Sequence, residues 1–182
     1  KSSLFGSVTQ KVLTLTTRPV LILRNRKILP HSVMNVGVCV DGSSFGETIA
    51  KTVVAHIKQF GEFVKFDVIS AVEIPDLPQH SRITPEKLSA LAKEAYDKNL
   101  KKVRPVFDAA GITFNEGILS AGNNPGEAIA QYAHDHKLDL LVMGTHGYSR
   151  LKSIFMGSTA LRVSSEGDIP IVIIQAEEYP ND

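Results

Sequence analysis

The sequence predicts an α/β protein with a parallel, doubly wound sheet of five strands, preceded by one extra helix and strand. Two observations carry this prediction. Between residues 33 and 174, apolar runs of strand length alternate with amphipathic segments of ten residues or more, which is the pattern of right-handed βαβ crossovers. In addition, residues 1–23 resemble residues 152–174, the predicted last helix and last strand of that sheet.

Five segments are expected to be strands, because each is an apolar run of strand length bounded by turn-forming residues. They are residues 33–40, 63–72, 112–120, 138–144 and 169–174. In a doubly wound sheet, ligands lie beyond the carboxyl ends of the strands, at the point where the winding reverses. Residues at those ends are therefore the place to look for chemistry.

The segments between the strands have helical spacing of their apolar residues. Helices are predicted over residues 45–60, 84–104 and 124–136, and over a last stretch that ends near residue 167. Thr84-Pro85 and Asn124-Pro125 are helix starts, each with a capping side chain followed by proline in the first turn. Pro105 is expected to kink or shorten the second of these helices.

Bulk composition excludes several classes of protein. The chain has 43% hydrophobic and 21% charged residues, and its apolar runs are far shorter than the roughly 20 residues that cross a bilayer. A single cysteine, Cys39, excludes a disulfide framework and a cysteine-based zinc site. Its place in the apolar run VGVCV indicates a buried, unreactive thiol. A cytoplasmic protein is expected.

The charge is unevenly distributed. Residues 1–32 carry six basic side chains and no carboxylate, whereas residues 33–182 carry 14 basic and 19 acidic side chains, for a net charge of −5. A basic arm can indicate nucleic acid or anionic lipid as the partner. Here the basic residues alternate with strand-like apolar residues, so we expect the arm to lie beside acidic surface of the same molecule, with neither nucleic acid nor membrane as partner.

The repeat suggests how the chain is organised. Residues 1–23 and 152–174 match at seven of 23 positions without a gap. We interpret the first copy as the last helix and strand of a preceding domain whose earlier strands are not in this sequence. Residues 24–32 are then a linker, residues 33–176 a complete domain and residues 177–182 a tail.

Two glycine-containing stretches could bind phosphate. Gly144-Thr-His-Gly147 follows a strand, and Gly157-Ser158 opens a helix after nine intervening residues. Glycine allows close approach of backbone amides to an anion, and the first amides of a helix favour negative charge. The alternative is that Gly144 and Gly147 only form a tight turn.

The same stretch, VMGTHGYSRLKSIFMGSTALRV, resembles the nucleotide-binding pattern of the universal stress protein family, Gly-x-x-Gly, nine residues, then Gly-Ser/Thr. VCVDGS, NNPGEAIAQYA and PIVII are also similar to family sequences. The resemblance covers residues 33–176 and implies the family's Rossmann-like fold. Because residues 1–23 resemble the end of another such domain, the chain is similar to the carboxyl-terminal part of a tandem-domain member.

The resemblance implies a site for ATP, or for ADP or AMP, with Mg²⁺. Asp41 would bond the ribose or the adenine. Cys39 and Val40 would line the pocket, and Ala71 or Val72 would pack on adenine. Amides for the phosphates would come from Gly144, His146 and Gly147, together with Gly157, Ser158 and Thr159. Arg150 would either pair with phosphate or stay solvated.

Three functions stay open. The first is an ATP-dependent stress-response or signalling module that hydrolyses ATP slowly at most, since no partner is visible that would orient His146 as a base. The second is a dimerisation or protein-interaction module without nucleotide. The third, a nucleotidyl-transfer or hydrolytic enzyme, lacks a second-substrate residue set. By the resemblance, last strands pair antiparallel, either across a homodimer or, within this chain, between residues 18–23 and 169–174.

Overall fold

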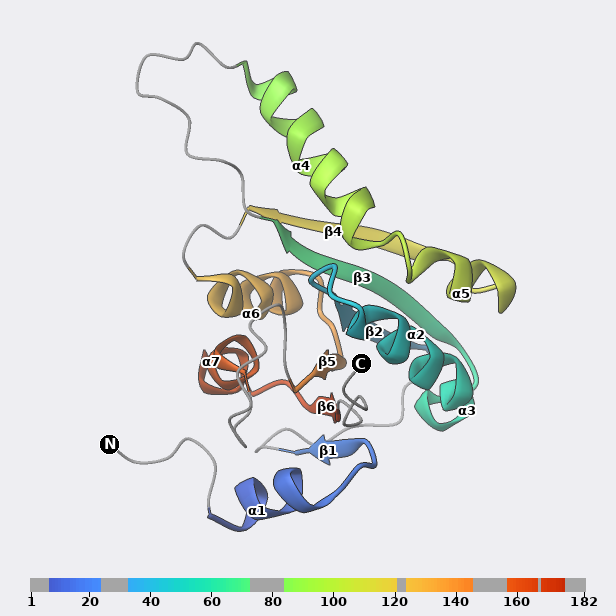
Figure 1. Cartoon of the computed structure of the whole chain (residues 1–182), viewed down its shortest axis with the longest axis vertical. Helices are drawn as coiled ribbons and strands as arrows, with labels where there is room; N and C mark the ends of the chain where they lie inside the picture. The colour runs from blue at the N-terminus through green and yellow to red at the C-terminus, as the bar shows by residue number, and fades with distance from the viewer. Residues whose placement is uncertain are drawn as a thin grey trace, which may run out of the picture.

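The computed structural model describes residues 7–23, 33–72, 84–120, 124–145, 157–166 and 168–175. Within these residues the chain forms one mixed sheet of six strands in the order β1-β6-β5-β2-β3-β4, with helices on both faces (Figure 1). The α/β fold class predicted from the sequence is confirmed.

Five of the strands are parallel to one another. They are β2 (Met34–Cys39), β3 (Val64–Val72), β4 (Phe114–Ser120), β5 (Leu140–Gly144) and β6 (Ile171–Ile174). Each begins one or two residues after its predicted start. The sixth strand, β1 (Val20–Ile22), pairs antiparallel with β6, as expected for residues 18–23 and 169–174.

The helices divide between the two faces of the sheet, and each group covers its own apolar core (Figure 1). The first face is covered by α2 (Phe45–Ala55), α3 (Ile57–Phe60), α4 (Pro85–Asn99) and α5 (Arg104–Ala109). The second face is covered by α1 (Ser7–Leu15), α6 (Pro125–Asp135) and α7 (Ser158–Glu166). Alternation along β3 illustrates the division, because Phe66 and Val68 enter the first core and Ile69 enters the second.

Two predicted helices are interrupted. The helix expected over residues 45–60 breaks at His56, which has φ −111° and ψ 11° and whose Nδ1 lies 2.9 Å from the carbonyl oxygen of Thr52. The helix expected over residues 84–104 ends at Asn99, and α5 begins at Arg104 with Pro105 in its first turn. The helix is therefore shorter than predicted and is not kinked, and Pro105 lies in the first turn of a new helix, where proline is well tolerated.

Both predicted helix starts are confirmed. The Thr84 Oγ1 accepts a hydrogen bond from the Lys87 amide at 3.4 Å, and Pro85 occupies the first turn of α4. The Asn124 Oδ1 accepts from the Glu127 amide at 3.4 Å, and the Asn124 side-chain amide donates to the Glu127 carboxylate. These caps satisfy amides that have no acceptor within their helix.

One carboxylate is buried beneath α6. Asp67 on β3 is 6% exposed; its Oδ1 accepts from Asn115 Nδ2 at 2.8 Å and its Oδ2 from the Tyr132 hydroxyl at 2.9 Å. Burial, together with the bond to Asp67, raises the pKa of Tyr132. Two donors from β4 and α6 thus compensate a charge that would otherwise be costly to bury, and they tie both elements to β3.

None of the helices that the structure describes has the length and apolar character needed to cross a membrane.

Candidate functional site

The winding of the sheet reverses between β2 and β5. These two strands are hydrogen-bonded neighbours, whereas β3 and β4 follow on one side and β6 on the other. The register Val38↔Val142 brings the carboxyl end of β2 next to the carboxyl end of β5. In sheets of this kind the space outside that pair of ends is the usual ligand position.

At the end of β2, Asp41 is half-buried and its Oδ1 accepts the Ser43 amide at 3.0 Å, which orients the carboxylate. Gly42 follows with φ +80°, a left-handed conformation that favours glycine. Its Cα hydrogens lie against the Asn99 side chain, which in turn donates to Ser70 Oγ at 2.8 Å. The turn after β2 is therefore held by the end of α4 and by β3.

At the end of β5, the backbone of Thr145 joins three elements. Its amide donates to the carbonyl oxygen of Ile174 at 3.0 Å, and its carbonyl oxygen accepts the Gly157 amide at 2.7 Å. The Thr145 residue is 4% exposed. The first turn of α7 is consequently fixed against the ends of β5 and β6.

The first turn of α7 has the character of an anion site. The carbonyl oxygen of Gly157 accepts the Leu161 amide at 3.0 Å, so the amides of Ser158, Thr159 and Ala160 lie where a helix provides no internal acceptor. No acidic residue occurs in this turn. Ser158 is exposed and Thr159 half-buried, and the helix dipole adds to the attraction for a negative group. The Gly157 amide itself is already used by Thr145.

Gly144 has a packing role of its own. A Cβ at this position would lie 2.6 Å from Cε1 of Phe45 and 2.7 Å from its Cδ1. The ring of Phe45 is buried in the core under α2. Glycine at the end of β5 therefore avoids an overlap with Phe45 as α2 packs on the sheet, whatever ligand is bound.

Three predicted site residues have side chains in the core. Cys39, Val40 and Val72 are 7%, 5% and 2% exposed, and Ala71 is half-buried. Cys39 is buried, as expected, and burial raises the pKa of its thiol to about 12. His146, Gly147 and Arg150 lie outside the described residues.

Sequence reasoning missed Thr145, Asn99 and Phe45. Thr145 lies inside the glycine motif, so its position was a usable signal, although its two backbone hydrogen bonds reach residues 12 and 29 positions away. Phe45 and Asn99 contact glycines that are far from them in the sequence. Nothing local indicates such contacts.

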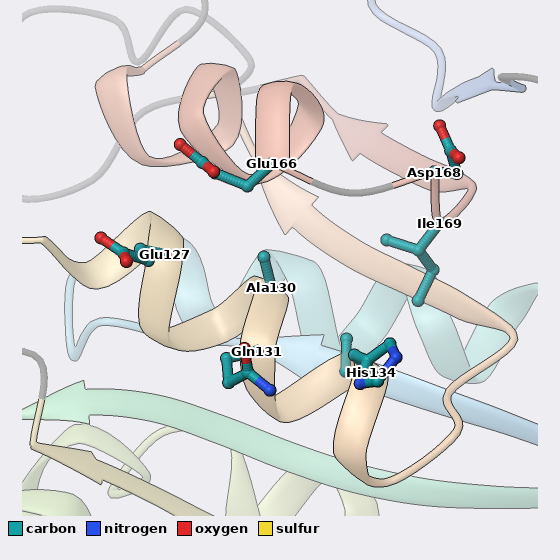
Figure 2. Close-up of a pocket in the computed structure, with 8 residues that line it drawn as sticks. Glu127, Ala130, Gln131, His134, Glu166, Asp168 and Ile169 are labelled. Carbon is teal, nitrogen blue, oxygen red and sulfur yellow. The ribbon is translucent and has the colours of Figure 1, made fainter.

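A separate pocket of about 460 Å³ lies between α6 and the connection from α7 to β6 (Figure 2). Three of its lining side chains, Glu127, Glu166 and Asp168, are carboxylates. Like charge makes this pocket unsuitable for a polyphosphate. Among the residues that the structure describes, no group of three or more histidine, cysteine or acidic side chains is placed to hold a metal ion.

Comparison with known proteins identifies the class to which this fold and switch-point geometry belong. The model of the universal stress protein family matches residues 33–175. The chain therefore belongs to the universal stress protein family.

Individual relatives that this chain resembles are also universal stress proteins. A universal stress protein of Methanocaldococcus jannaschii is 29% identical over 155 residues, which are 85% of this chain and 87% of that one. A universal stress protein structure from Archaeoglobus fulgidus has a TM-score of 0.63 at 20% identity and matches 96% of this chain, but this match spans only 56% of that longer chain. Another from the same organism, in complex with dAMP, has a TM-score of 0.51 at 22% identity, over 79% of this chain and 99% of that one.

Proposed function

We propose that residues 33–175 bind an adenine nucleotide, foremost ATP, and that the protein acts as a nucleotide-dependent stress-response or signalling module. The observation that carries this proposal is the pair of Thr145 hydrogen bonds, which hold the first turn of α7 at the switch point beside the end of β2. An anion-binding turn and a carboxylate on neighbouring strand ends suit a ligand with phosphate at one end and hydroxyl or amine donors at the other.

The roles follow from this placement. The amides of Ser158 and Thr159, with their hydroxyl groups, bind phosphate, and Gly157 keeps the approach to them free of a side chain. Asp41 accepts from the ribose or adenine, and Ala71 or Val72 lies against the base. His146, Gly147 and Arg150 supply further phosphate contacts. Mg²⁺ arrives on the phosphates, since ATP sites generally hold it mainly through phosphate oxygens and water.

The family supports the ligand class. One structural neighbour was solved with dAMP, as given above, and another universal stress protein, with a TM-score of 0.50, in complex with cAMP. Both ligands contain adenine, a five-membered sugar ring and one phosphate. The proposed site therefore includes AMP and ADP as well as ATP in its range.

A second function, interaction with a further protein domain without nucleotide, is favoured by one observation. Five large apolar side chains on or next to α1 and β1 are exposed, namely Val8, Val12, Leu15, Leu21 and Leu23. That surface lies beside β6, away from the switch point, so the two functions are compatible in one molecule.

The test is thermal unfolding of the chain with increasing millimolar ATP, ADP and AMP. A ligand at 100 times its Kd stabilises the folded state by about 2.7 kcal/mol, which raises Tm by several degrees. Gly157→Val and Asp41→Asn should remove most of the shift, whereas Asp168→Asn, the same chemical change in the acidic pocket, should leave it intact. Absence of any shift in the unmodified chain at millimolar nucleotide would refute the proposal.

A further inference from the structure

Asp41 lies in a turn that leaves one of its carboxylate oxygens available to a ligand. Its Oδ1 accepts the Ser43 amide at 3.0 Å, and within the part of the chain that the structure describes no donor is hydrogen-bonded to Oδ2. Oδ2 is thus the atom that can accept a hydroxyl or amine donor. Its position depends on the turn, because the bond to the Ser43 amide ties the carboxylate to the backbone of that turn.

Asn99, the last residue of α4, supports this turn from behind. A Cβ at Gly42 would overlap Asn99 Oδ1 and lie 2.9 Å from Asn99 Cγ, so the Gly42 backbone lies directly against the Asn99 side chain. α4 covers the first face of the sheet and α7 covers the second. Asn99 therefore contacts the turn on the side opposite to α7, outside the space proposed for the phosphates.

The Asn99 side chain is itself held by buried groups. Its Nδ2 donates to the Oγ of Ser70, which is fully buried on β3. One helical turn earlier, the Tyr96 hydroxyl donates to the carbonyl oxygen of Val68 at 2.7 Å, and Leu100, the residue after Asn99, is also fully buried. Two hydrogen bonds to β3 and a buried leucine thus fix the end of α4.

The register of the sheet connects these contacts with the site. The Val40 amide donates to the carbonyl oxygen of Ile69 at 2.9 Å, so Ser70 stands beside the residue that precedes Asp41. By its contact with the turn after β2 and its hydrogen bond to Ser70, Asn99 bridges the ends of β2 and β3. These are the two strand ends proposed above to hold the ribose and the adenine.

We propose that Asn99 is a positioning residue, which places the Asp41 carboxylate for the nucleoside part of the ligand and thereby sets how strongly the site holds the ribose or the adenine. This inference rests on the proposed nucleotide function. The phosphate contacts belong to α7, on the other face of the sheet. Loss of the Asn99 side chain should therefore weaken recognition of the nucleoside and leave recognition of phosphate unchanged.

Double-mutant cycles of ADP affinity test this role. Asn99→Ala should weaken ADP binding about tenfold, the loss expected when one hydrogen bond to a charged group is displaced. In the Asp41→Asn background, the same substitution should change the affinity by less than about twofold, because the carboxylate that it displaces is already gone. In the Ser158→Ala background it should keep its full effect. A tenfold loss in the Asp41→Asn background as well would overturn the proposal.

Two further variants separate positioning from a general loss of stability. Tyr96→Phe removes the neighbouring hydrogen bond from α4 to β3, so it should lower stability without changing ADP affinity. Ser70→Ala removes only the hydrogen-bond partner of Asn99 and should weaken ADP binding by a smaller factor, which keeps the test available if Asn99→Ala does not fold. The proposal is wrong if Tyr96→Phe weakens ADP binding as much as Asn99→Ala does, or if Ser70→Ala leaves it unchanged.

Amide hydrogen exchange tests the positioning without any ligand. In Asn99→Ala the Ser43 amide should exchange at least about tenfold faster, because the turn that holds it is released, whereas the Leu161 amide in α7 should be unaffected. Unchanged exchange at Ser43 would overturn this inference whether or not nucleotide binds. Faster exchange at Ser43, together with no ADP binding by the unmodified chain, would instead refute the proposed function, and the nucleoside role of Asn99 with it.

Discussion

Leu21 and Val172 face each other across the antiparallel β1–β6 pair and are the same position of an internal repeat. A pair of equivalent residues in register marks a local two-fold axis. The axis explains how β1, a strand of three residues, extends a parallel sheet that is formed by a later part of the chain. It also makes the geometry of the β1–β6 pairing testable at one pair of residues.

The double variant Leu21→Cys/Val172→Cys should form a disulfide on mild oxidation. Residues directly opposite in an antiparallel pair have Cα atoms about 4.5–5.5 Å apart, within the range that a disulfide spans. Mass spectrometry after alkylation under denaturing conditions counts the free thiols, of which one, Cys39, should remain. In the control Leu21→Cys/Ile174→Cys the residues are diagonal, and three free thiols should be found. Three free thiols in the first variant would contradict the register.

Deleting residues 1–32 should turn the chain into a homodimer. The deletion exposes the edge of β6, and the same two-fold register then allows β6 to pair with a second β6, with Val172 opposite Val172 of the partner subunit. Light scattering coupled to size exclusion measures the mass. Val172→Lys in the deleted chain places two like charges on the axis and should restore a monomer; a monomer without that substitution would speak against the prediction.

Gly144→Ala should lower the free energy of unfolding by about 1–3 kcal/mol, because the added methyl group overlaps the ring of Phe45. The effect should be present without nucleotide. Urea unfolding of Gly144→Ala, Phe45→Leu and the double variant forms a mutant cycle. The double variant should lose less stability than the sum of the two single losses, because the smaller side chain at position 45 makes room for the added methyl group at position 144. Strict additivity would show that the Phe45 contact is not the cause.

Tyr132→Phe should cost about 1.5–3 kcal/mol of stability, because it leaves a buried Asp67 oxygen without its hydroxyl donor. The matched control is Tyr96→Phe, which removes a 2.7 Å bond from another buried hydroxyl to the uncharged carbonyl oxygen of Val68. That change should cost only about 0.5–1.5 kcal/mol. Chemical denaturation at neutral pH measures both, and an equal loss in the two variants would mean that the Asp67 charge contributes nothing.

Glu116 should make stability depend on pH. Hydrogen bonds from Lys93 and Arg104 hold its pKa below the usual range, so its contribution is present above the pKa of the unfolded chain and is lost as the pH falls through the lower folded value. Glu116→Gln should cost at most about 1 kcal/mol at pH 7, since the group is partly exposed, and almost nothing near pH 2.

The measurement for Glu116 is urea unfolding across this pH range, with Glu94→Gln on the exposed side of α4 as the control. A loss of stability for Glu116→Gln that is the same at both ends of the range would rule out the ion pairs as its origin.

The order of elements could be predicted from the sequence because it depends on local signals. Apolar runs placed all five parallel strands within two residues of their observed starts, and Thr84 and Asn124 located two helix starts through their own side chains. The break at His56 escaped prediction, since apolar spacing continues across it and the interruption comes from the local backbone at that residue.

The candidate site was predictable only in part, because some of its features follow from local signals and others depend on contacts between distant segments. Asp41, Gly144 and Gly157 stand at strand ends and a helix start that the sequence places in order, so their convergence follows from the fold class. The contact of Gly144 with Phe45 joins residues 99 positions apart, and that of Gly42 with Asn99 joins residues 57 positions apart; both depend on how α2 and α4 pack. Packing of that kind leaves no pattern in a single sequence.

The four residues of β6 lie between the proposed nucleotide pocket and the surface formed by α1 and β1. One edge of this strand pairs with β5 and ends at the Ile174 carbonyl oxygen that holds Thr145; the other edge pairs with β1. The proposed nucleotide pocket and the exposed apolar surface of α1 and β1 therefore share one strand as a common boundary. If occupancy of either alters that strand, thermodynamic reciprocity requires that each change the affinity of the other by the same factor. Nucleotide binding would then change the affinity for a neighbouring domain without any contact between that domain and the nucleotide.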